Sequence, residues 1–203
     1  MIKELNYFLS LQIWQNESSI FISQSKYANN LVKKFVLEST NSVRTPMSLN
    51  VKLTVNLLGK SVDPTLYRSM IGSLLYLTAS IPDISYCVGM CATYEANPKE
   101  SYIIVVKRII KYVNSTSNFG VWYDTDTNDV LAGYSDVDWA GNADDRKITF
   151  GACFYLGNNL VSWMSKNQNS ISFSTTEAEY IAVTNYCTQL LWMQKLLFGY
   201  GIC

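Results

Sequence analysis

Histidine is absent from the 203 residues of this chain, and its five cysteines include no Cys-x-x-Cys pair. The chain therefore lacks the residues that most often build structural zinc sites, and no imidazole can act as a general acid or base in it. Lysine plus arginine and aspartate plus glutamate number 16 each. Because net charge does not mark the chain as a binder of polyanions, any affinity for nucleic acid must come from local patches.

A long apolar run is absent as well. The longest uncharged stretch, residues 148–165, is interrupted by Gly157-Asn158-Asn159, and its aromatic residues recur every second position. That pattern predicts a hairpin rather than a membrane span. The start, MIKELNYFLSLQI, carries early charges and lacks the apolar stretch of a signal peptide. We therefore expect an intracellular protein, cytoplasmic or nuclear, without a membrane partner, in which Cys87 and Cys91 are buried thiols rather than a disulfide.

Hydrophobic residues make up 48% of the chain and charged residues 16%, a balance that predicts a folded core in one or two domains. Tyr7–Trp14 and Ser19–Ser23 flank a polar turn and predict a β-hairpin. A helix capped by Ser23 or Ser25 should follow, because apolar residues then repeat every four positions.

Three more helices are expected, from Asp63-Pro64 to about Ala79, from Pro82 to about Ala96, and from Pro98 to about Val113. The last has an apolar face and a group of cations, Lys107, Arg108 and Lys111. These cations fit either a solvated surface or a phosphate contact. Residues 114–118 are polar and predict a linker between domains 1–118 and 119–203.

Beyond the linker the pattern changes to strands and then to one long helix from Ser174 to about Phe198, so the fold class should be α+β. Four strands are expected, at Phe119–Tyr123, Val130–Asp138, Thr149–Leu156 and Leu160–Met164.

Two glutamates open the long helix and predict different roles. Ser174 and Glu177 have the spacing of a capping box, in which the serine oxygen accepts from an amide three residues on. Glu179 instead heads the most apolar stripe of the helix, which continues through Val183, Tyr186, Leu190, Met193 and Leu197. A carboxylate there needs a partner or a cation.

A strand that precedes this helix offers acidic partners. Asp136 and Asp138 alternate with apolar residues and should share one sheet face beside Tyr134. Carboxylates from a strand and a crossing helix predict a site for Mg²⁺ or Mn²⁺, which could assist phosphodiester hydrolysis. The structural alternative is that aspartates at a strand end only stabilise turns.

The order of motifs closely resembles the ribonuclease H region of copia-type LTR retrotransposon polyproteins. The similarity rests on Gly133–Gly141 (GYSDVDWAG), Asp145-Arg146-Lys147, Val161-Ser162-Trp163 and Ser174–Tyr180 (STTEAEY). The first half resembles the stretch after the polymerase active site, in LNYFLSLQI (5–13), FISQSKYANNLVKKF (21–35), YRSMIGSLLYLTASIPDISY (67–86) and KRIIKYV (107–113). The resemblance covers nearly the whole chain.

The resemblance implies a C-terminal reverse transcriptase region in residues 1–118. Residues 119–203 would then form a truncated ribonuclease H-like domain of three antiparallel strands and one long helix. Asp136 and Glu179 match the family's catalytic magnesium or manganese ligands, and Asp138 matches an accessory aspartate. The implied partners are RNA:DNA hybrid or other nucleic acid and the remainder of the Pol polyprotein.

Two family motifs have no counterpart in the chain. The Tyr-Val-Asp-Asp polymerase motif is missing, so we expect no DNA synthesis, and the third ribonuclease H aspartate is missing, so we expect little or no hydrolysis. Three readings stay open at this point: a fragment with weak metal-dependent cleavage of the RNA strand, an inactive relic, or a non-catalytic binder. The binder would contact phosphates through Lys107, Arg108, Lys111, Arg146, Lys147 and Lys166.

Overall fold

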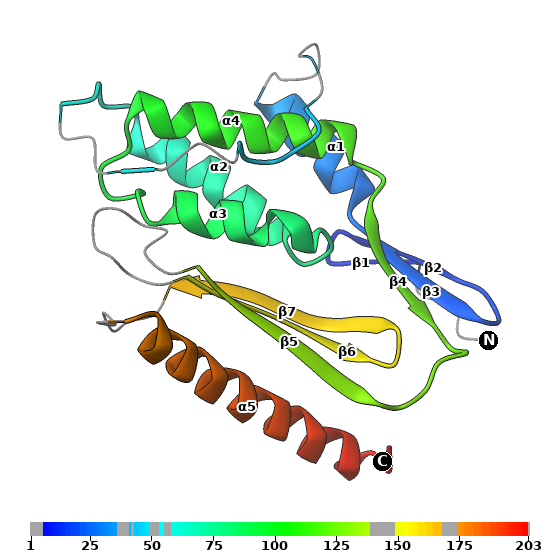
Figure 1. Cartoon of the computed structure of the whole chain (residues 1–203). Helices are drawn as coiled ribbons and strands as arrows, with labels where there is room; N and C mark the ends of the chain where they lie inside the picture. Colours follow the sequence, from blue (N-terminus) through cyan, green and yellow to red (C-terminus); the bar gives the residue numbers. More distant parts are fainter. Residues whose placement is uncertain are drawn as a thin grey trace. The chain divides into compact units, whose positions relative to one another are not determined.

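The structure is a computed structural model that describes residues 6–35, 41, 43–48, 53–54, 58–138, 149–167 and 174–202. It divides into two compact units (Figure 1). Unit 1 comprises Met1–Asn16 with Ile20–Val121, and unit 2 comprises Glu17–Ser19 with Trp122–Cys203. Across the described residues, no helix is both long and apolar enough to cross a lipid bilayer.

Both units contain an antiparallel sheet and helices, so the α+β expectation is confirmed. A sheet of order β1-β2-β3-β4 consists of Tyr7–Phe8, Leu11–Gln15, Ser19–Ser23 and Gly120–Asp124. The helices that follow β3 are α1 (Ser25–Lys34), α2 (Pro64–Leu77), η1 (Pro82–Ile84), α3 (Ser85–Ala92) and α4 (Glu100–Ser115).

The predicted single strand Tyr7–Trp14 is wrong, because the chain turns inside it. Leu9 and Ser10 have φ of 46° and 61°, so the backbone is left-handed at both positions and reverses there. Strands β1 and β2 therefore pair with each other, with Phe8 opposite Leu11. The predicted hairpin with Ser19–Ser23 is confirmed, since β2 and β3 are antiparallel with Gln15 opposite Ile20.

Helix α1 lacks the predicted serine cap. Gln24 occupies the N-cap position and makes no capping bond with its side chain. The amide of Lys26 in the first turn instead donates to Gln12 Oε1 at 2.8 Å, so an acceptor on β2 satisfies it. Helix α2 starts as predicted, because Asp63 accepts from the Thr65 amide at 2.9 Å and Pro64 follows.

The next two helices differ from the prediction, since α3 is shorter than expected and α4, at 16 residues, keeps the expected length but lies two residues further along the chain. The segment expected to run from Pro82 to Ala96 forms a 3₁₀ turn and then α3, which ends at Ala92. Helix α4 begins at Glu100 rather than Pro98, because Lys99 is extended at the N-cap. Its predicted apolar face is confirmed and faces the core with Val106, Ile110 and Val113 fully buried.

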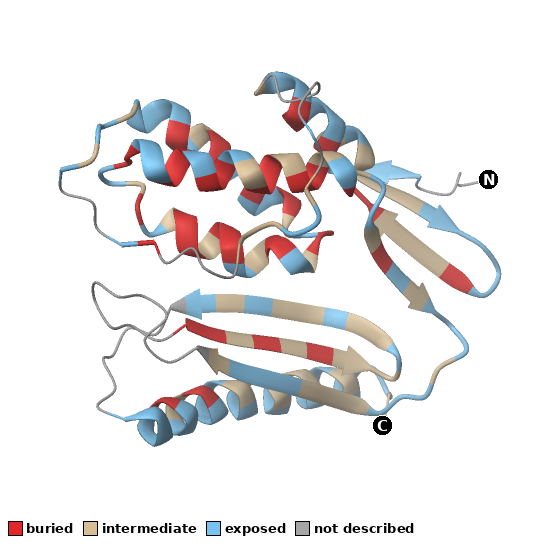
Figure 2. Cartoon of the chain, turned by 45° about the horizontal axis from the view of Figure 1, so that its top comes forward, coloured by how far each residue is buried: buried red, intermediate tan, exposed pale blue. Residues whose placement is uncertain are grey.

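The core of unit 1 lies among α1, α2, α3 and α4 (Figure 2). Its largest fully buried side chains include Tyr67, Met70, Ile71, Leu74, Ile84 and Ile109. Tyr67 Oη donates to the Cys91 carbonyl at 2.9 Å, so this buried phenol has a polar partner. Cys87 and Cys91 are free, buried thiols as predicted.

Unit 2 contains the sheet β5-β6-β7 and the long helix α5 (Thr175–Gly199). The strands Leu131–Asp138, Thr149–Leu156 and Asn159–Asn167 pair antiparallel. The buried core is formed by Phe150, Ala152, Phe154 and Ala182, and Tyr186, Leu190 and Met193 pack against it from α5. This part agrees with the predicted three strands and one helix.

Candidate functional site

The start of α5 separates the roles of its two glutamates. Ser174 is extended at the N-cap, and its Oγ accepts from the Glu177 amide at 3.1 Å. The predicted serine cap is therefore confirmed. Glu177 itself lies in the first turn, where a carboxylate is favourable next to the positive end of the helix dipole.

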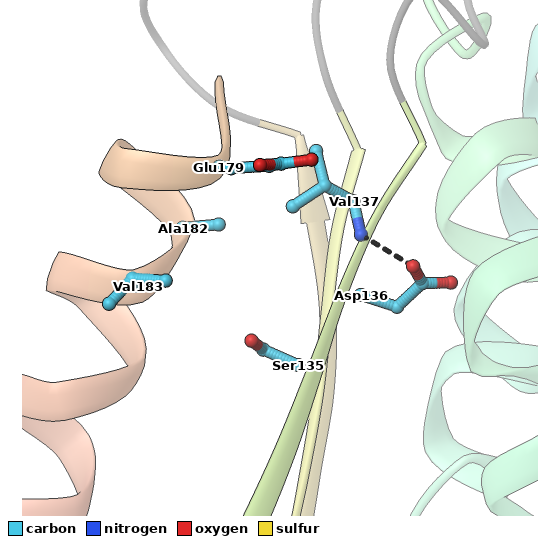
Figure 3. Close-up of a pocket in the computed structure, with 6 residues that line it drawn as sticks. All are labelled: Ser135, Asp136, Val137, Glu179, Ala182 and Val183. Atoms are coloured by element: carbon cyan, nitrogen blue, oxygen red, sulfur yellow. Dashed lines mark hydrogen bonds between the residues drawn. The ribbon is translucent and has the colours of Figure 1, made fainter. Parts of the chain in front are cut away.

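Glu179 lies at the edge of the helix stripe that faces the sheet. The buried residues at the head of this stripe are Ala178 and Ala182, whereas Glu179 is exposed and Val183 is 48% exposed. The prediction that Glu179 sits on the sheet-facing side agrees with its position beside Val137 (Figure 3). The expectation of a buried carboxylate is wrong, because Ala178 and Ala182, rather than Glu179, are the buried residues at the start of α5.

The register of β5 decides which of its side chains face α5. Val137 lies opposite Phe150, and Gly133 lies opposite Phe154, both of which belong to the buried core beneath α5. Residues directly opposite in an antiparallel pair share a face, so Gly133, Ser135 and Val137 face the helix. Asp136 and Tyr134 therefore share the other face of the sheet.

The close-up agrees with this register (Figure 3). The carboxylate of Asp136 points away from α5, and its Oδ1 accepts from the Val137 amide at 2.9 Å. The carboxylate of Glu179 lies on the opposite side of β5, and the Ser135 hydroxyl points toward the helix. The two predicted ligands thus come from neighbouring elements but do not converge. The side chain of Asp138 lies outside the described residues.

A pocket of about 270 Å³ lies between β5 and α5. It is lined by Ser135, Asp136, Val137, Glu179, Ala182 and Val183. Magnesium requires octahedral oxygen ligands and is usually held by one or two carboxylates with waters and phosphate oxygens. Among the six lining residues, only Glu179 presents a carboxylate on the helix side. The described residues include no group of three acidic, cysteine or histidine side chains suited to a metal. This arrangement does not fit a divalent ion held between Asp136 and Glu179, and their assignment as catalytic ligands stays a prediction.

Val183, a member of the predicted apolar stripe, lines this pocket, and so does Ser135, to which the sequence analysis gave no role. The signal was available for Ser135, since strand alternation places it on the face of Gly133 and Val137. The alternation of side chains along β5 does not indicate which of the two sheet faces α5 covers.

The basic residues proposed to contact phosphate differ in their surroundings. Lys107 on α4 is exposed and Lys111 is half-buried. Arg108 contacts the segment before α2, where its Nη2 donates to Thr45 Oγ1 at 3.0 Å and its Nε donates to the Thr45 carbonyl at 3.3 Å. Arg108 therefore has a structural role already.

The other basic candidates belong to unit 2. Lys166 is exposed on β7, in the row that also holds Phe150 and Val137. Arg146 and Lys147 lie outside the described residues. Nucleic-acid contact by any of these six side chains stays a prediction.

A second polar group lies inside unit 1. Tyr112 Oη donates to Asp83 Oδ2, and burial together with this bond raises the pKa of Tyr112 to about 12. Burial and the nearby Asp83 carboxylate also raise the pKa of the Cys87 thiol to about 11. Both groups are therefore neutral at ordinary pH, and Cys87 is a poor nucleophile.

Comparison with known proteins gives long alignments. The chain is 37% identical over 200 residues to the retrovirus-related Pol polyprotein from transposon RE1 of Arabidopsis thaliana, which covers 98% of this chain and 14% of that protein. It is 30% identical over 203 residues to the Pol polyprotein from transposon TNT 1-94 of Nicotiana tabacum. It is also 34% identical over 188 residues to the uncharacterized mitochondrial protein AtMg00810 of Arabidopsis thaliana, covering 93% of this chain and 78% of that protein.

The chain belongs to the copia-type retrotransposon Pol family. It spans about 14% of the RE1 polyprotein and 15% of the TNT 1-94 polyprotein, so it corresponds to a short part of these copia-type Pol proteins. No protein-family model matches the chain. No solved structure matches it.

Proposed function

We propose that this chain is the copia Pol segment that joins the end of the reverse transcriptase to the start of the ribonuclease H domain. Residues 1–118 would represent the former and residues 119–203 the latter. The parent reaction is hydrolysis of RNA in an RNA:DNA hybrid with Mg²⁺ or Mn²⁺. We further propose that this chain by itself does not carry out that hydrolysis.

Two sequence motifs support this lineage, because one lies on a strand and the other on the helix that neighbours it. The GYSDVDWAG motif occupies the end of β5 and the residues after it, and the STTEAEY motif occupies the capped start of α5. These two elements are neighbours in unit 2. Family similarity at 30–37% identity extends across both motifs.

The observation that carries the inactivity proposal is the opposed direction of Asp136 and Glu179. Hydrolysis assisted by two metal ions needs carboxylates that converge on ions about 4 Å apart. Here the carboxylates lie on opposite sides of β5 (Figure 3), and no described acidic side chain adds a third ligand. The remainder of the Pol polyprotein would have to supply further ligands for the parent reaction.

A cleavage assay on labelled RNA:DNA hybrid with Mg²⁺ or Mn²⁺ tests this proposal. The full chain should release no more product than the double variant Asp136→Asn, Glu179→Gln, while an active ribonuclease H cuts the same substrate. Cleavage by the full chain that both Asp136→Asn and Glu179→Gln abolish would overturn the inactivity proposal and restore the two carboxylates as catalytic ligands.

A further inference from the structure

The segment between α1 and α2 contains a threonine that is followed by a proline. The prolines of the chain are Pro46, Pro64, Pro82 and Pro98, and only Pro46 follows a serine or threonine, which is Thr45. Proline has a fixed φ and no amide N–H, and it biases the residue before it toward an extended backbone. Proline-directed serine/threonine kinases recognise a hydroxyl that is followed by this backbone shape.

Thr45 is accessible and lies outside regular secondary structure. Arg44 and Thr45 are exposed, whereas Val43 and Met47 on either side pack against the core of unit 1. Residues 43–48 belong to no helix or strand, and no backbone–backbone hydrogen bond links them to another described residue. This loop is therefore held by side chains, and it can open locally without breaking a helix or a sheet.

The loop follows one side of α4. Ser115 Oγ donates to the Val43 carbonyl at 3.1 Å, and Arg108 donates both of its hydrogen bonds to Thr45. Arg108, Lys111 and Ser115 are spaced three and four positions apart, so they lie on the same side of the helix. The loop thus runs along this side in the direction opposite to α4, and Lys111 lies between the two contacts.

The guanidinium of Arg108 is already placed to bind a phosphate on Thr45. Its Nη2 donates to Thr45 Oγ1 at 3.0 Å, and its Nε donates to the Thr45 carbonyl at 3.3 Å. Its other N–H groups stay available, and no carboxylate among the described residues forms an ion pair with it. A phosphorylated threonine carries roughly −1.5 to −2 charges and three strong acceptor oxygens, which arginine binds with parallel hydrogen bonds.

We propose that Thr45 is a phosphorylation site for a proline-directed serine/threonine kinase and that Arg108 binds the resulting phosphate. Thr45 Oγ1 attacks the γ-phosphorus of ATP, and the bond from that phosphorus to the β,γ-bridging oxygen breaks. ADP leaves with the electron pair of this bond, and the hydroxyl proton passes to the catalytic base of the kinase. The phosphate then fastens the loop to α4 through Arg108, while Lys111 adds positive charge on the same side of the helix.

Treatment of the full chain with ATP, Mg²⁺ and either a mitogen-activated or a cyclin-dependent protein kinase tests the modification. Tandem mass spectrometry should locate one phosphoryl group on Thr45. Thr45→Ala and Pro46→Ala should both lose this modification, whereas Thr45→Ser should retain it. The proposal is overturned if neither kinase modifies Thr45, or if Pro46→Ala is phosphorylated at position 45 as fast as the parent chain.

Phosphorus NMR of the phosphorylated chain tests the role of Arg108. A guanidinium next to the phosphate should lower the second pKa of the phosphate below its ordinary value of about 6. Arg108→Gln should return this pKa to the ordinary value. Lys107→Gln is the matched control, because it removes the same charge from the exposed neighbouring position of α4 and should change the pKa much less.

A second measurement covers the case in which Arg108→Gln does not fold. The Nε–H signal of Arg108 in the parent chain should shift on phosphorylation, and it should shift again as the phosphate titrates. An ordinary second pKa in the folded, phosphorylated parent chain would overturn the binding of the phosphate by Arg108. Equal changes in Arg108→Gln and Lys107→Gln, with both variants folded by their amide spectra, would overturn it as well.

Discussion

The hydroxyl of Tyr186 donates to the carbonyl of Gly133 at 2.8 Å and so joins the middle of α5 to β5. The ring of Tyr186 stacks on Phe154 with a centroid distance of 5.5 Å. Gly133 permits this contact because it has no side chain: a Cβ there would lie 2.7 Å from Tyr186 Cε2 and 2.9 Å from Phe154 Cδ1. Gly133, the first residue of the GYSDVDWAG motif, thus sets how closely the helix approaches the sheet.

Gly133→Ala should destabilise unit 2 by about 1–3 kcal/mol, because both neighbours belong to the packed core and must move. Amide hydrogen exchange of β5 and β6, together with urea unfolding, measures this effect. Gly151→Ala is the matched control, since its Cβ would come no closer than 4.0 Å to any atom, the Asp136 carbonyl oxygen. Equal stability of the two variants would contradict the close approach of α5 at Gly133.

The bond between Tyr112 and Asp83 makes the stability of unit 1 depend on alkaline pH. The pKa of Tyr112 is raised to about 12 in the folded state, above its ordinary value near 10. The folded state therefore binds the phenol proton more tightly, so this contribution is fully present below pH 10 and is lost as pH rises toward 12. Tyr112→Phe should be less stable than the parent at pH 8, and the difference should shrink as pH approaches 12.

Urea unfolding at several pH values between 8 and 12 checks this prediction. Tyr180→Phe serves as the control, because Tyr180 is 71% exposed on α5. A stability difference between Tyr112→Phe and the parent that stays constant across this range would show that the phenol proton is not responsible.

Local signals predicted many of the helix boundaries correctly. Asp63-Pro64 starts α2, and Ser174 caps α5 with its bond to Glu177. The apolar repeat of α4 also predicted its buried face. These features follow from residues a few positions apart, and the sequence contains that information directly.

The prediction of the site was wrong where the structure depends on contacts between residues far apart in the sequence. Strand alternation correctly placed Asp136 and Tyr134 on one face, but it gave no information on which face α5 would cover. That choice depends on Gly133, which leaves room for Tyr186, and on Phe154, which fills the core. The turn at Leu9 and Ser10 was missed because neither residue is one that favours a left-handed backbone.

Leu9→Asn with Ser10→Gly should stabilise the β1–β2 hairpin by about 1 kcal/mol, because both residues have positive φ and asparagine and glycine tolerate it best. Hydrogen exchange of the Ile13 amide, which donates to the Asn6 carbonyl at 3.0 Å, measures the gain. Leu58→Asn controls for the removal of an exposed leucine, since Leu58 is fully exposed. Faster exchange in the double variant would refute the left-handed turn.

Lys107 and Arg108 should behave differently on α4. If α4 contacts phosphates, Lys107→Ala should weaken hybrid binding and reduce the slope of log affinity against log salt by roughly one. Arg108→Ala should instead lower the stability of unit 1, because it removes both bonds to Thr45. Fluorescence anisotropy at several salt concentrations and urea unfolding separate the two effects. Lys195 is an exposed cation on α5, so Lys195→Ala controls for the loss of one positive charge. If Lys107→Ala leaves the slope of log affinity against log salt unchanged, Lys107 is only solvated and makes no phosphate contact.

The short segment Glu17–Ser19 groups with unit 2 although its sequence neighbours on both sides belong to unit 1. The Ser18 carbonyl accepts from both the amide and the hydroxyl of Thr125, each at 2.8 Å. If the chain were divided between Val121 and Trp122, by proteolysis or by expressing the two parts separately, Glu17–Ser19 would therefore stay with the N-terminal fragment. Thr125 in the C-terminal fragment would then lose the Ser18 carbonyl as its hydrogen-bond acceptor. Anyone dissecting the molecule into separately expressed halves would have to graft the 17–19 loop onto the second piece to obtain a faithful copy of it.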